Sequence, residues 1–491
     1  MKTSVWLAAS LFLFILPTGI RADVSLPRVF GDNMVLQCGV SVPVWGRAAP
    51  GEKVVVRFAG QEKPAQAAAD GRWAVMLDPL AASAVAREMT VAGANVIQLR
   101  NILTGEVWLC SGQSNMEYAV GVAKAWAPPA TATDPSLAQE IKAGTFPELR
   151  LFRVEKKREP GEVVSSGWQE AAGEARNEFS AVGYYFAHRL RRDLDVPVGM
   201  IQTAWGGSRI EEWTPAESYA QLAAVFAGGA AASFERDPVW IGRNFEAMVR
   251  PLAPFAMRGV VWYQGESNLI AYNDGLRYAD KLAALIGAWR GAWNRTDLPF
   301  FTVQIAPFLY TQRKDALPHS AEELPKLWEA QAAALRIPHT GLVPTTDLVD
   351  DLSNIHPAHK REVGERLAAL ALAETYGRRG LTWTGPEFAR LEIDGSEAVV
   401  FFNNANDGLA SRDGKPLTGF EIAGTDGAFV SAEAVIRGQT VVVSNPKVVV
   451  PVAVRLGWSE AAQPNLVNHA GLPAYPFRSN GPAWTGKIPR N

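Results

Sequence analysis

The stretch Glu106-Val-Trp-Leu-Cys-Ser-Gly-Gln-Ser-Asn-Met116 decides the fold of the middle of this 491-residue chain. Its first five residues are mostly apolar and typical of a buried β-strand, and a polar turn containing a glycine follows directly. Open α/β sheets bind their ligands beyond the carboxyl ends of such strands. Ser114 therefore stands where a serine can face a ligand, although a serine that caps a helix would look the same. The turn lacks the second glycine of Gly-x-Ser-x-Gly, so it is not the ordinary α/β-hydrolase signature.

The region from residue 104 to residue 378 repeats this strand-and-turn pattern in alternation with amphipathic helices. Such alternation predicts an α/β fold in which a mostly parallel sheet is sandwiched by helices. The strand-like runs lie at 106–110, 198–204, 259–263 and 299–305, and the helical patterns lie at 182–194, 278–293 and 359–376.

Two regions of β character flank this part of the chain. Residues 23–103 contain short strand patterns separated by turns and predict a β-sandwich-like domain, and residues 379–491 predict a C-terminal β-rich domain. Residues 1–22 have the pattern of a signal peptide, because Lys2 precedes an apolar run that is too short to span a bilayer. An uncleaved anchor is the alternative. We therefore expect an exported protein, periplasmic or extracellular.

The composition is that of an ordinary globular protein, with 48% apolar residues, 20% charged residues and a net charge of −2. This balance does not favour nucleic acid or an anionic membrane as a partner. The two cysteines, Cys38 and Cys110, are too few for a disulfide framework, and whether they pair is left open. No zinc or calcium motif is present, so no metal is expected. A cation bound by Asp347, Asp350 and Asp351 is the weaker alternative.

A second polar turn follows the strand expected at residues 198–204. It contains Gly206 and Gly207, which allow a tight turn with a backbone N–H group aimed outward, as an oxyanion donor requires. A phosphate-binding loop is the competing interpretation, but neither its glycine spacing nor a Lys-Ser/Thr pair is present. The simplest alternative is a Gly-Gly turn without any chemical role.

A third polar cluster, Trp-Tyr-Gln-Gly-Glu-Ser-Asn, occupies residues 262–268 after another strand. Gln264 offers a side-chain N–H₂ group for an oxyanion. Glu266 offers a carboxylate that can orient a histidine or contact a substrate hydroxyl. The alternative is a polar loop that satisfies its own hydrogen bonds.

The fourth cluster contains His356 and precedes the helix expected at residues 359–376. A single histidine is more often structural than catalytic. A histidine supported by a carboxylate is nevertheless suited to act as a general base, and Asp350 and Asp351 are close in sequence. Together the four clusters supply a nucleophile, oxyanion donors and a base, and we expect them to converge on one rim of the sheet.

Four motifs in this order, at 112–116, 205–207, 262–268 and 354–357, resemble the sialate O-acetylesterase family. That family belongs to the SGNH hydrolase superfamily and is related to bacterial acetylxylan esterases. The resemblance extends to Phe30-Gly-Asp-Asn-Met-Val-Leu-Gln37 and to Gly471-Leu-Pro-Ala-Tyr-Pro-Phe477 at the two ends of the chain. It implies an SGNH-type esterase domain with flanking β-domains, and a carbohydrate O-acetylesterase that uses a serine acyl-enzyme and no cofactor.

The resemblance also implies roles for individual residues. Ser114 matches the nucleophile and His356 the general base. The oxyanion donors would be the backbone N–H groups of Ser114 and of Gly206 or Gly207, together with the Gln264 side chain. Many SGNH enzymes place the supporting aspartate three residues before the histidine, where this chain has a serine.

The acid partner of His356 is therefore left open. Glu266 and Asp351 are equally favoured candidates. Ser353, which occupies the usual aspartate position, and a Ser-His dyad with backbone support are the alternatives.

The expected substrate is an acetylated sugar. Arg209 can pair with a sialate or uronate carboxylate and the nearby tryptophans can stack on sugar rings, although an internal ion pair and core packing would explain them equally well. Acetylated xylan, xyloglucan or pectin is the alternative substrate. A non-catalytic carbohydrate-binding protein and a long-chain esterase are the alternative functions. The residues expected at the substrate are Gln113, Asn115, Trp205, Arg209, Trp213 and Asn268.

Overall fold

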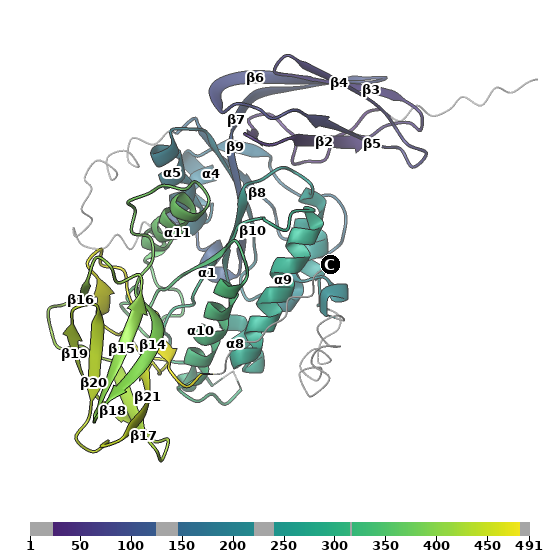
Figure 1. Ribbon diagram of the computed structural model, residues 1–491. Coiled ribbons are helices and arrows are strands. Elements are labelled where there is room, and N and C mark those ends of the chain that lie inside the picture. Colours follow the sequence, from purple (N-terminus) through teal and green to yellow (C-terminus); the bar gives the residue numbers. More distant parts are fainter. Residues whose placement is uncertain (1–22, 124–145, 220–239, 315–316, 482–491) are drawn as a thin grey trace, which may run out of the picture.

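The computed structural model describes residues 23–123, 146–219, 240–314 and 317–481. The expected signal peptide, residues 1–22, lies outside these ranges. In the described part of the chain, no helix is long and apolar enough to cross a membrane. Figure 1 shows a central α/β part with a β-rich unit at each end of the chain.

The centre of the molecule is a sheet with strand order β13-β12-β11-β7-β10-β8-β9. Neighbouring strands are parallel except for β9, which runs antiparallel to β8. The expected strands at 198–204 and 259–263 are β10 and β11. The strands are β7 (Val96–Gly112), β8 (Leu149–Arg153), β9 (Trp168–Glu170), β10 (Val198–Ala204), β11 (Gly259–Tyr263), β12 (Phe300–Val303) and β13 (Thr340–Val343).

Helices cover both faces of this sheet, as the sequence predicts. α5 and α11 pack against each other on one face, and α9 and α10 lie on the other (Figure 1). The helices are α1 (Ser114–Glu117), α2 (Val120–Ala123), α4 (Gly173–Asn177), α5 (Ala181–Leu194), α8 (Glu266–Tyr272), α9 (Tyr278–Ala292), α10 (Glu323–Ala333) and α11 (Lys360–Glu374).

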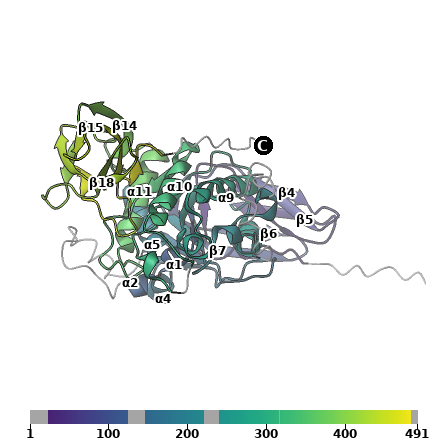
Figure 2. The ribbon, with the colours of Figure 1, turned by 90° about the horizontal axis from the view of Figure 1, so that it is seen from below.

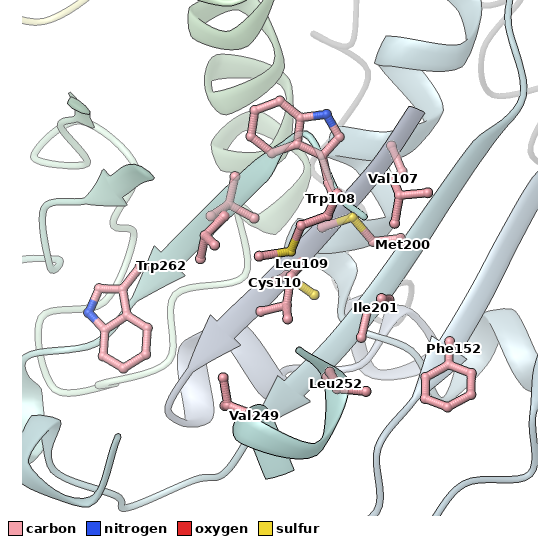
Figure 3. Close-up of a cluster of buried hydrophobic side chains, with 14 of the residues drawn as sticks. Val107, Trp108, Leu109, Cys110, Phe152, Met200, Ile201, Val249, Leu252 and Trp262 are labelled. Carbon is pink, nitrogen blue, oxygen red and sulfur yellow. The ribbon is translucent and has the colours of Figure 1, made fainter. Parts of the chain in front are cut away.

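Strand β7 belongs to two parts of the molecule at once. Its first half pairs with β6 of the N-terminal β-strands, and its second half pairs with β10 and β11. The expected domain boundary between residues 103 and 104 therefore falls inside one continuous strand. Figure 3 shows Val107, Trp108, Leu109 and Cys110 of β7 among the buried side chains of the central core. The two cysteines of the chain are free.

The two flanking β units lie at opposite ends of the molecule in both views (Figures 1 and 2). The N-terminal β unit comprises β1 (Val35–Gln37), β2 (Val42–Arg47), β3 (Lys53–Phe58), β4 (Gln61–Gln66), β5 (Arg72–Leu77) and β6 (Ser83–Ala92). The C-terminal β unit comprises β14 (Glu387–Asp394), β15 (Glu397–Asn403), β16 (Leu409–Ser411), β17 (Phe420–Gly424), β18 (Phe429–Ser431), β19 (Glu433–Arg437), β20 (Thr440–Ser444), β21 (Pro451–Leu456), β22 (Leu466–Asn468) and β23 (Phe477–Arg478).

The two units differ in how they join the centre. One hydrophobic core continues from the N-terminal β unit into the central sheet, whereas the C-terminal β unit has a core of its own. The C-terminal unit docks through polar contacts. The buried Glu460 carboxylate accepts hydrogen bonds from the backbone N–H and the hydroxyl of Thr311, and Gln463 donates to the Val349 carbonyl at 2.6 Å.

A buried carboxylate fixes the junction between the N-terminal β unit and the centre. Glu106 of β7 accepts two hydrogen bonds from Arg258, at 2.7 and 2.9 Å, and others from Gln37 at 3.0 Å and Tyr376 at 2.9 Å. Burial alone would raise the pKa of Glu106, but the hydrogen bonds and charge of Arg258, together with the hydrogen bonds from Gln37 and Tyr376, lower it overall. The carboxylate is thus held in its charged form by groups from both parts of the molecule.

We expect Glu106→Gln to lower the free energy of unfolding by about 3 kcal/mol, because it leaves Arg258 without its counter-charge. This loss of stability is at the lower end of the range for breaking a buried ion pair, since 24% of the Arg258 side chain is exposed. Guanidinium unfolding of the wild type and the variant measures the difference. The control is Glu62→Gln, which breaks an exposed pair with Arg57 and is expected to cost less than about 1 kcal/mol. Equal losses in both variants would contradict this account.

Candidate active site

Three of the four polar clusters begin at the carboxyl ends of neighbouring strands, at residues that are paired in the sheet. Gly112 at the end of β7 lies beside Ala204 of β10 and Tyr263 of β11. A Cβ atom at Gly112 would meet the Tyr263 carbonyl oxygen at 2.1 Å, and the glycine has a φ of +139°. Only glycine fits this position, where the chain leaves the sheet and turns into α1. The expected convergence on the carboxyl edge of the sheet is therefore what the structure shows.

Ser114 and His356 meet at this edge. Ser114 is the first residue of α1, and its Oγ atom lies 2.8 Å from Nε2 of His356. His356 comes from the loop before α11, and its backbone N–H group donates to Oδ1 of Asn354 at 2.9 Å. Burial, with the nearby charge of Lys360, lowers the pKa of His356 below its usual 6.5. A neutral imidazole at this distance can accept the hydroxyl proton, as a general base must.

Neither of the two expected acid partners contacts the imidazole. Asp351 is exposed, and its Oδ1 atom accepts hydrogen bonds from the backbone N–H group of Ser353 at 2.8 Å and from the Ser353 hydroxyl at 2.7 Å. Glu266 is buried beneath the dyad, and its Oε1 atom accepts from Asn115 at 2.5 Å. Within the described residues, His356 makes no ion pair with a carboxylate. Asp350 instead pairs with His359 at 2.8 Å.

The backbone donors are arranged differently from the expectation for Gly206. The Gly206 N–H group donates to Oε2 of Glu117 at 2.6 Å, and Oε1 of Glu117 pairs with Lys156 at 2.6 Å. Within the described residues, the N–H groups of Ser114 and Gly207 donate to no other protein group. Gly207 has a φ of +77° and open space where a Cβ would be. These two N–H groups are therefore the ones available for an oxyanion.

Gln264 does not present its amide to the cavity. The side chain is fully buried, and its Nε2 atom donates to Gln113, to the Ser208 carbonyl and to Asn268, at 3.0, 3.2 and 2.7 Å. Its Oε1 atom accepts from Tyr278 at 2.7 Å. All of its polar atoms are thus engaged with the protein, so the expectation of a side-chain oxyanion donor is not met in this arrangement.

A cavity of about 730 Å³ opens beside Ser114 and His356. Of the residues expected at the substrate, Gln113, Trp205 and Arg209 line it, whereas Asn115, Trp213 and Asn268 are fully buried. Trp213 donates to the Ser208 hydroxyl at 2.8 Å, and a side chain without exposed surface cannot stack on a sugar. The described residues of the lining are Gln113, Ser114, Arg158, Trp205, Gly206, Gly207, Ser208, Arg209, Glu212, Trp240, Ser267, Ile270, Ala271, Arg313, Ile355 and His356.

Asn268 stabilises the floor of the cavity instead of facing the substrate. It accepts from the Ile210 N–H group at 2.9 Å and donates to Glu211 and Asp274, at 2.9 and 2.8 Å. The buried Lys281 ammonium pairs with both carboxylates, at 2.5 and 2.7 Å. This network anchors the segment that follows the Gly206-Gly207 turn, and so fixes the position of that turn relative to Ser114.

The structure adds cavity residues that the sequence analysis did not single out. Arg158 and Arg313 bring two further guanidinium groups to the cavity, and Trp240 brings a second indole. The Arg158 guanidinium stacks on the rings of both Trp205 and Trp240, 5.2 and 4.6 Å from their centroids. These residues lie in loops without a recognisable motif, so only their position in the fold identifies them. Among the described residues, no group of acidic, histidine or cysteine side chains is suited to a metal ion.

Comparisons with known proteins identify the family of this chain. A family model described as "Carbohydrate esterase, sialic acid-specific acetylesterase" matches residues 104–373. Human sialate O-acetylesterase is 29% identical over 399 residues, covering 74% of this chain and 73% of that protein. The mouse enzyme is 27% identical over 433 residues, covering 75% and 77%. The crystal structure of a carbohydrate acetylesterase from Xanthomonas citri is similar with a TM-score of 0.81 at 35% identity, covering 94% of this chain and all of that one.

We expect a fluorophosphonate probe to modify the chain at Ser114, and His356→Ala to slow the modification by about 100-fold or more, because the serine loses its base. Mass spectrometry of the labelled peptide identifies the site. The control is Ser111→Ala, since Ser111 is buried nearby and donates to the Thr203 carbonyl at 2.9 Å. That variant should be labelled at the wild-type rate. Labelling of the wild type at a serine other than Ser114 would contradict the assignment.

Proposed function

Because the chain belongs to the sialic acid-specific acetylesterase family of carbohydrate esterases, and is thus a carboxylic ester hydrolase, we propose that Ser114 and His356 carry out its reaction. The substrate is an O-acetylated carbohydrate. The observation that carries the proposal is the 2.8 Å contact between Ser114 Oγ and His356 Nε2 beside the cavity. Ser114 acts as nucleophile and His356 as general base.

The acylation step follows from this contact. Nε2 of His356 takes the hydroxyl proton while Oγ of Ser114 forms a bond to the acetyl carbonyl carbon. The carbonyl oxygen becomes an oxyanion, which accepts hydrogen bonds from the N–H groups of Ser114 and Gly207. The tetrahedral intermediate then breaks its bond to the sugar oxygen, and the imidazolium returns the proton to that oxygen. The sugar leaves as an alcohol and the acetyl group stays on Ser114.

The second half of the reaction repeats these roles with water. His356 takes a proton from a water molecule whose oxygen attacks the acetyl carbonyl carbon, and the ester bond to Ser114 breaks. The proton returns to Oγ and acetate is released. Glu117 has a supporting part, because its carboxylate bonds to the Gly206 N–H group and so holds the turn that presents Gly207.

The lining of the cavity favours a sugar that carries a carboxylate, as sialic acid does. Among the described residues, three arginines, Arg158, Arg209 and Arg313, line the cavity beside Ser114 and His356, and Glu212 is the one carboxylate in that lining. Burial raises the pKa of Glu212 above its usual 4.5, against the lowering effect of the Arg209 backbone and charge. Arginine forks match carboxylate geometry, and Trp205 and Trp240 offer faces for sugar rings.

Export is a separate part of the proposal. It rests on the apolar pattern of residues 1–22 alone, which precede the first described residue. An enzyme in the periplasm or outside the cell would meet acetylated glycans there.

We expect Ser114→Ala to lower kcat/KM for p-nitrophenyl acetate by about 10⁴-fold or more, because it removes the hydroxyl group that forms the acyl-enzyme. Ester hydrolysis followed by absorbance measures the loss, and circular dichroism checks that the variant is folded. Wild-type activity should be higher on acetyl than on octanoyl esters. A wild type that does not exceed buffer would favour the non-catalytic alternative, and faster cleavage of octanoyl esters would favour a long-chain esterase.

We expect Arg209→Met to lower kcat/KM for O-acetylated sialic acid by about 10- to 100-fold, the loss of one hydrogen-bonded charge pair. Hydrolysis of p-nitrophenyl acetate, which has no carboxylate, should change less than about threefold. The matched control is Arg250→Met, which removes a surface arginine paired with Glu246. Acetate release from acetylated sialosides, xylan, xyloglucan and pectin ranks these compounds as substrates of the wild type. A wild type that prefers a neutral acetylated polysaccharide would overturn the proposed substrate.

A further inference from the structure

A lysine is buried directly behind the proposed base. Lys360 is the first residue of α11 and lies four positions after His356, and only 1% of its surface is exposed. Its Nζ atom donates to Oδ1 of Asn115 at 2.8 Å and to the Pro357 carbonyl oxygen. The ammonium also lies over the Tyr118 ring, 4.9 Å from its centroid. A charged lysine in such a position is costly unless it is paired.

Asn115 connects this lysine to Glu266. Its Nδ2 atom donates to Oε1 of Glu266 at 2.5 Å and to the Ile355 carbonyl oxygen at 3.0 Å. Glu266 and Lys360 therefore lie on either side of one amide group, and each hydrogen bond runs in the direction that the charges require. Asn115 is also the residue after Ser114, so the network touches the backbone of the proposed nucleophile.

The network forms hydrogen bonds to the backbone on both sides of His356. Asn115 bonds to the carbonyl of Ile355, and Lys360 bonds to the carbonyl of Pro357. The imidazole between these two anchors points at Ser114. In serine hydrolases with a triad, a carboxylate at the second ring nitrogen has this orienting role. Here the described residues supply no such carboxylate, and the loop that carries the histidine is fixed through its peptide groups instead.

We propose that Lys360 is a positioning residue for the reaction, which holds His356 against Ser114 through Asn115 and the flanking carbonyl groups, with Glu266 as its counter-charge. The inference rests on the proposed function of Ser114 and His356. In this proposal Glu266 acts without touching the imidazole, because its charge stabilises the ammonium that holds the loop.

The charge of Lys360 also affects the pKa of His356, and the pH dependence of the reaction can therefore test the role of the lysine. After burial, the Lys360 charge is the second cause of the lowered pKa of His356. Burial lowers the pKa of Lys360 itself to about 7, opposed by Glu266, so the ammonium is charged at the acidic pH where His356 titrates. Tyr118 lies against both groups, Tyr263 lies against the lysine, and Arg158, Arg209, Arg313 and Glu212 share the cavity with His356.

The test compares Lys360→Met, Lys326→Met and the wild type on p-nitrophenyl acetate. We expect Lys360→Met to lower kcat by about 100-fold with KM within about twofold, because a displaced base loses the proton-transfer geometry without losing the cavity. The pH profile gives a second readout. In the wild type, the midpoint of the acidic fall in kcat/KM should lie below pH 6.5, since activity is lost as pH falls through the lowered pKa of His356. We call this fall the acidic limb. That limb should move to higher pH in Lys360→Met, whose base lacks the neighbouring charge. Lys326→Met, on the surface of α10, should match the wild type.

Lys360→Met also leaves Glu266 buried without a counter-charge, which could prevent folding. The double variant Lys360→Met/Glu266→Gln removes both charges and gives the same readouts. We expect it to retain the loss of kcat and the displaced acidic limb. A folded single or double variant with wild-type kcat and an unmoved limb would overturn the inference. That outcome is distinct from failure of the proposed function, which would appear as full activity in Ser114→Ala.

Discussion

The active-site geometry depends on the pairing of one strand, β7, with two neighbours at once. Its hydrogen bonds to β10 and β11 bring Gly112 level with Ala204 and Tyr263, so three polar turns leave the sheet at one height. The close approach of Gly112 to the Tyr263 carbonyl leaves no room for a side chain at that point. The turn that begins α1 then directs Ser114 toward His356. The same strand continues into the N-terminal β unit, so its register also connects the two parts of the molecule.

The proposed base is oriented in an unusual way for a serine hydrolase. Asp351 is exposed and accepts a hydrogen bond from Ser353, and Glu266 accepts one from Asn115, so neither carboxylate is bonded to the imidazole. Holding the loop by its carbonyl groups fixes the direction of the imidazole but places no negative charge on its ring. The nearby ammonium of Lys360 instead favours the neutral ring, which is the form that can accept a proton.

Regular elements with a clear hydrophobic period could be predicted closely. The expected runs at 198–204 and 259–263 are β10 and β11 to the residue, and α5 and α9 differ from the expected helices by one residue at one end. Strand β8 was not anticipated, because its sequence carries two arginines. Arg150 is nevertheless buried there, where its guanidinium donates to the Pro147 carbonyl at 2.6 Å and pairs with Glu170. The sequence around a buried charged residue does not show which groups will pair with it in the fold.

The sequence by itself determined the alternation of strands and helices, the four polar turns, the identities of Ser114 and His356 as a candidate pair, and the family resemblance. All of these features can be read from residues that are close in the sequence, since each polar turn comes directly after a strand or before a helix. Only the tertiary structure decided which groups face each other. It buried Trp213, Gln264 and Asn268, placed the Gly206 N–H group on Glu117, and enclosed Lys360 behind the histidine loop. The physical reason is that burial and hydrogen-bond partners arise from segments far apart in the sequence, such as Asn115 and Lys360, which are 245 residues apart and whose proximity no local pattern encodes.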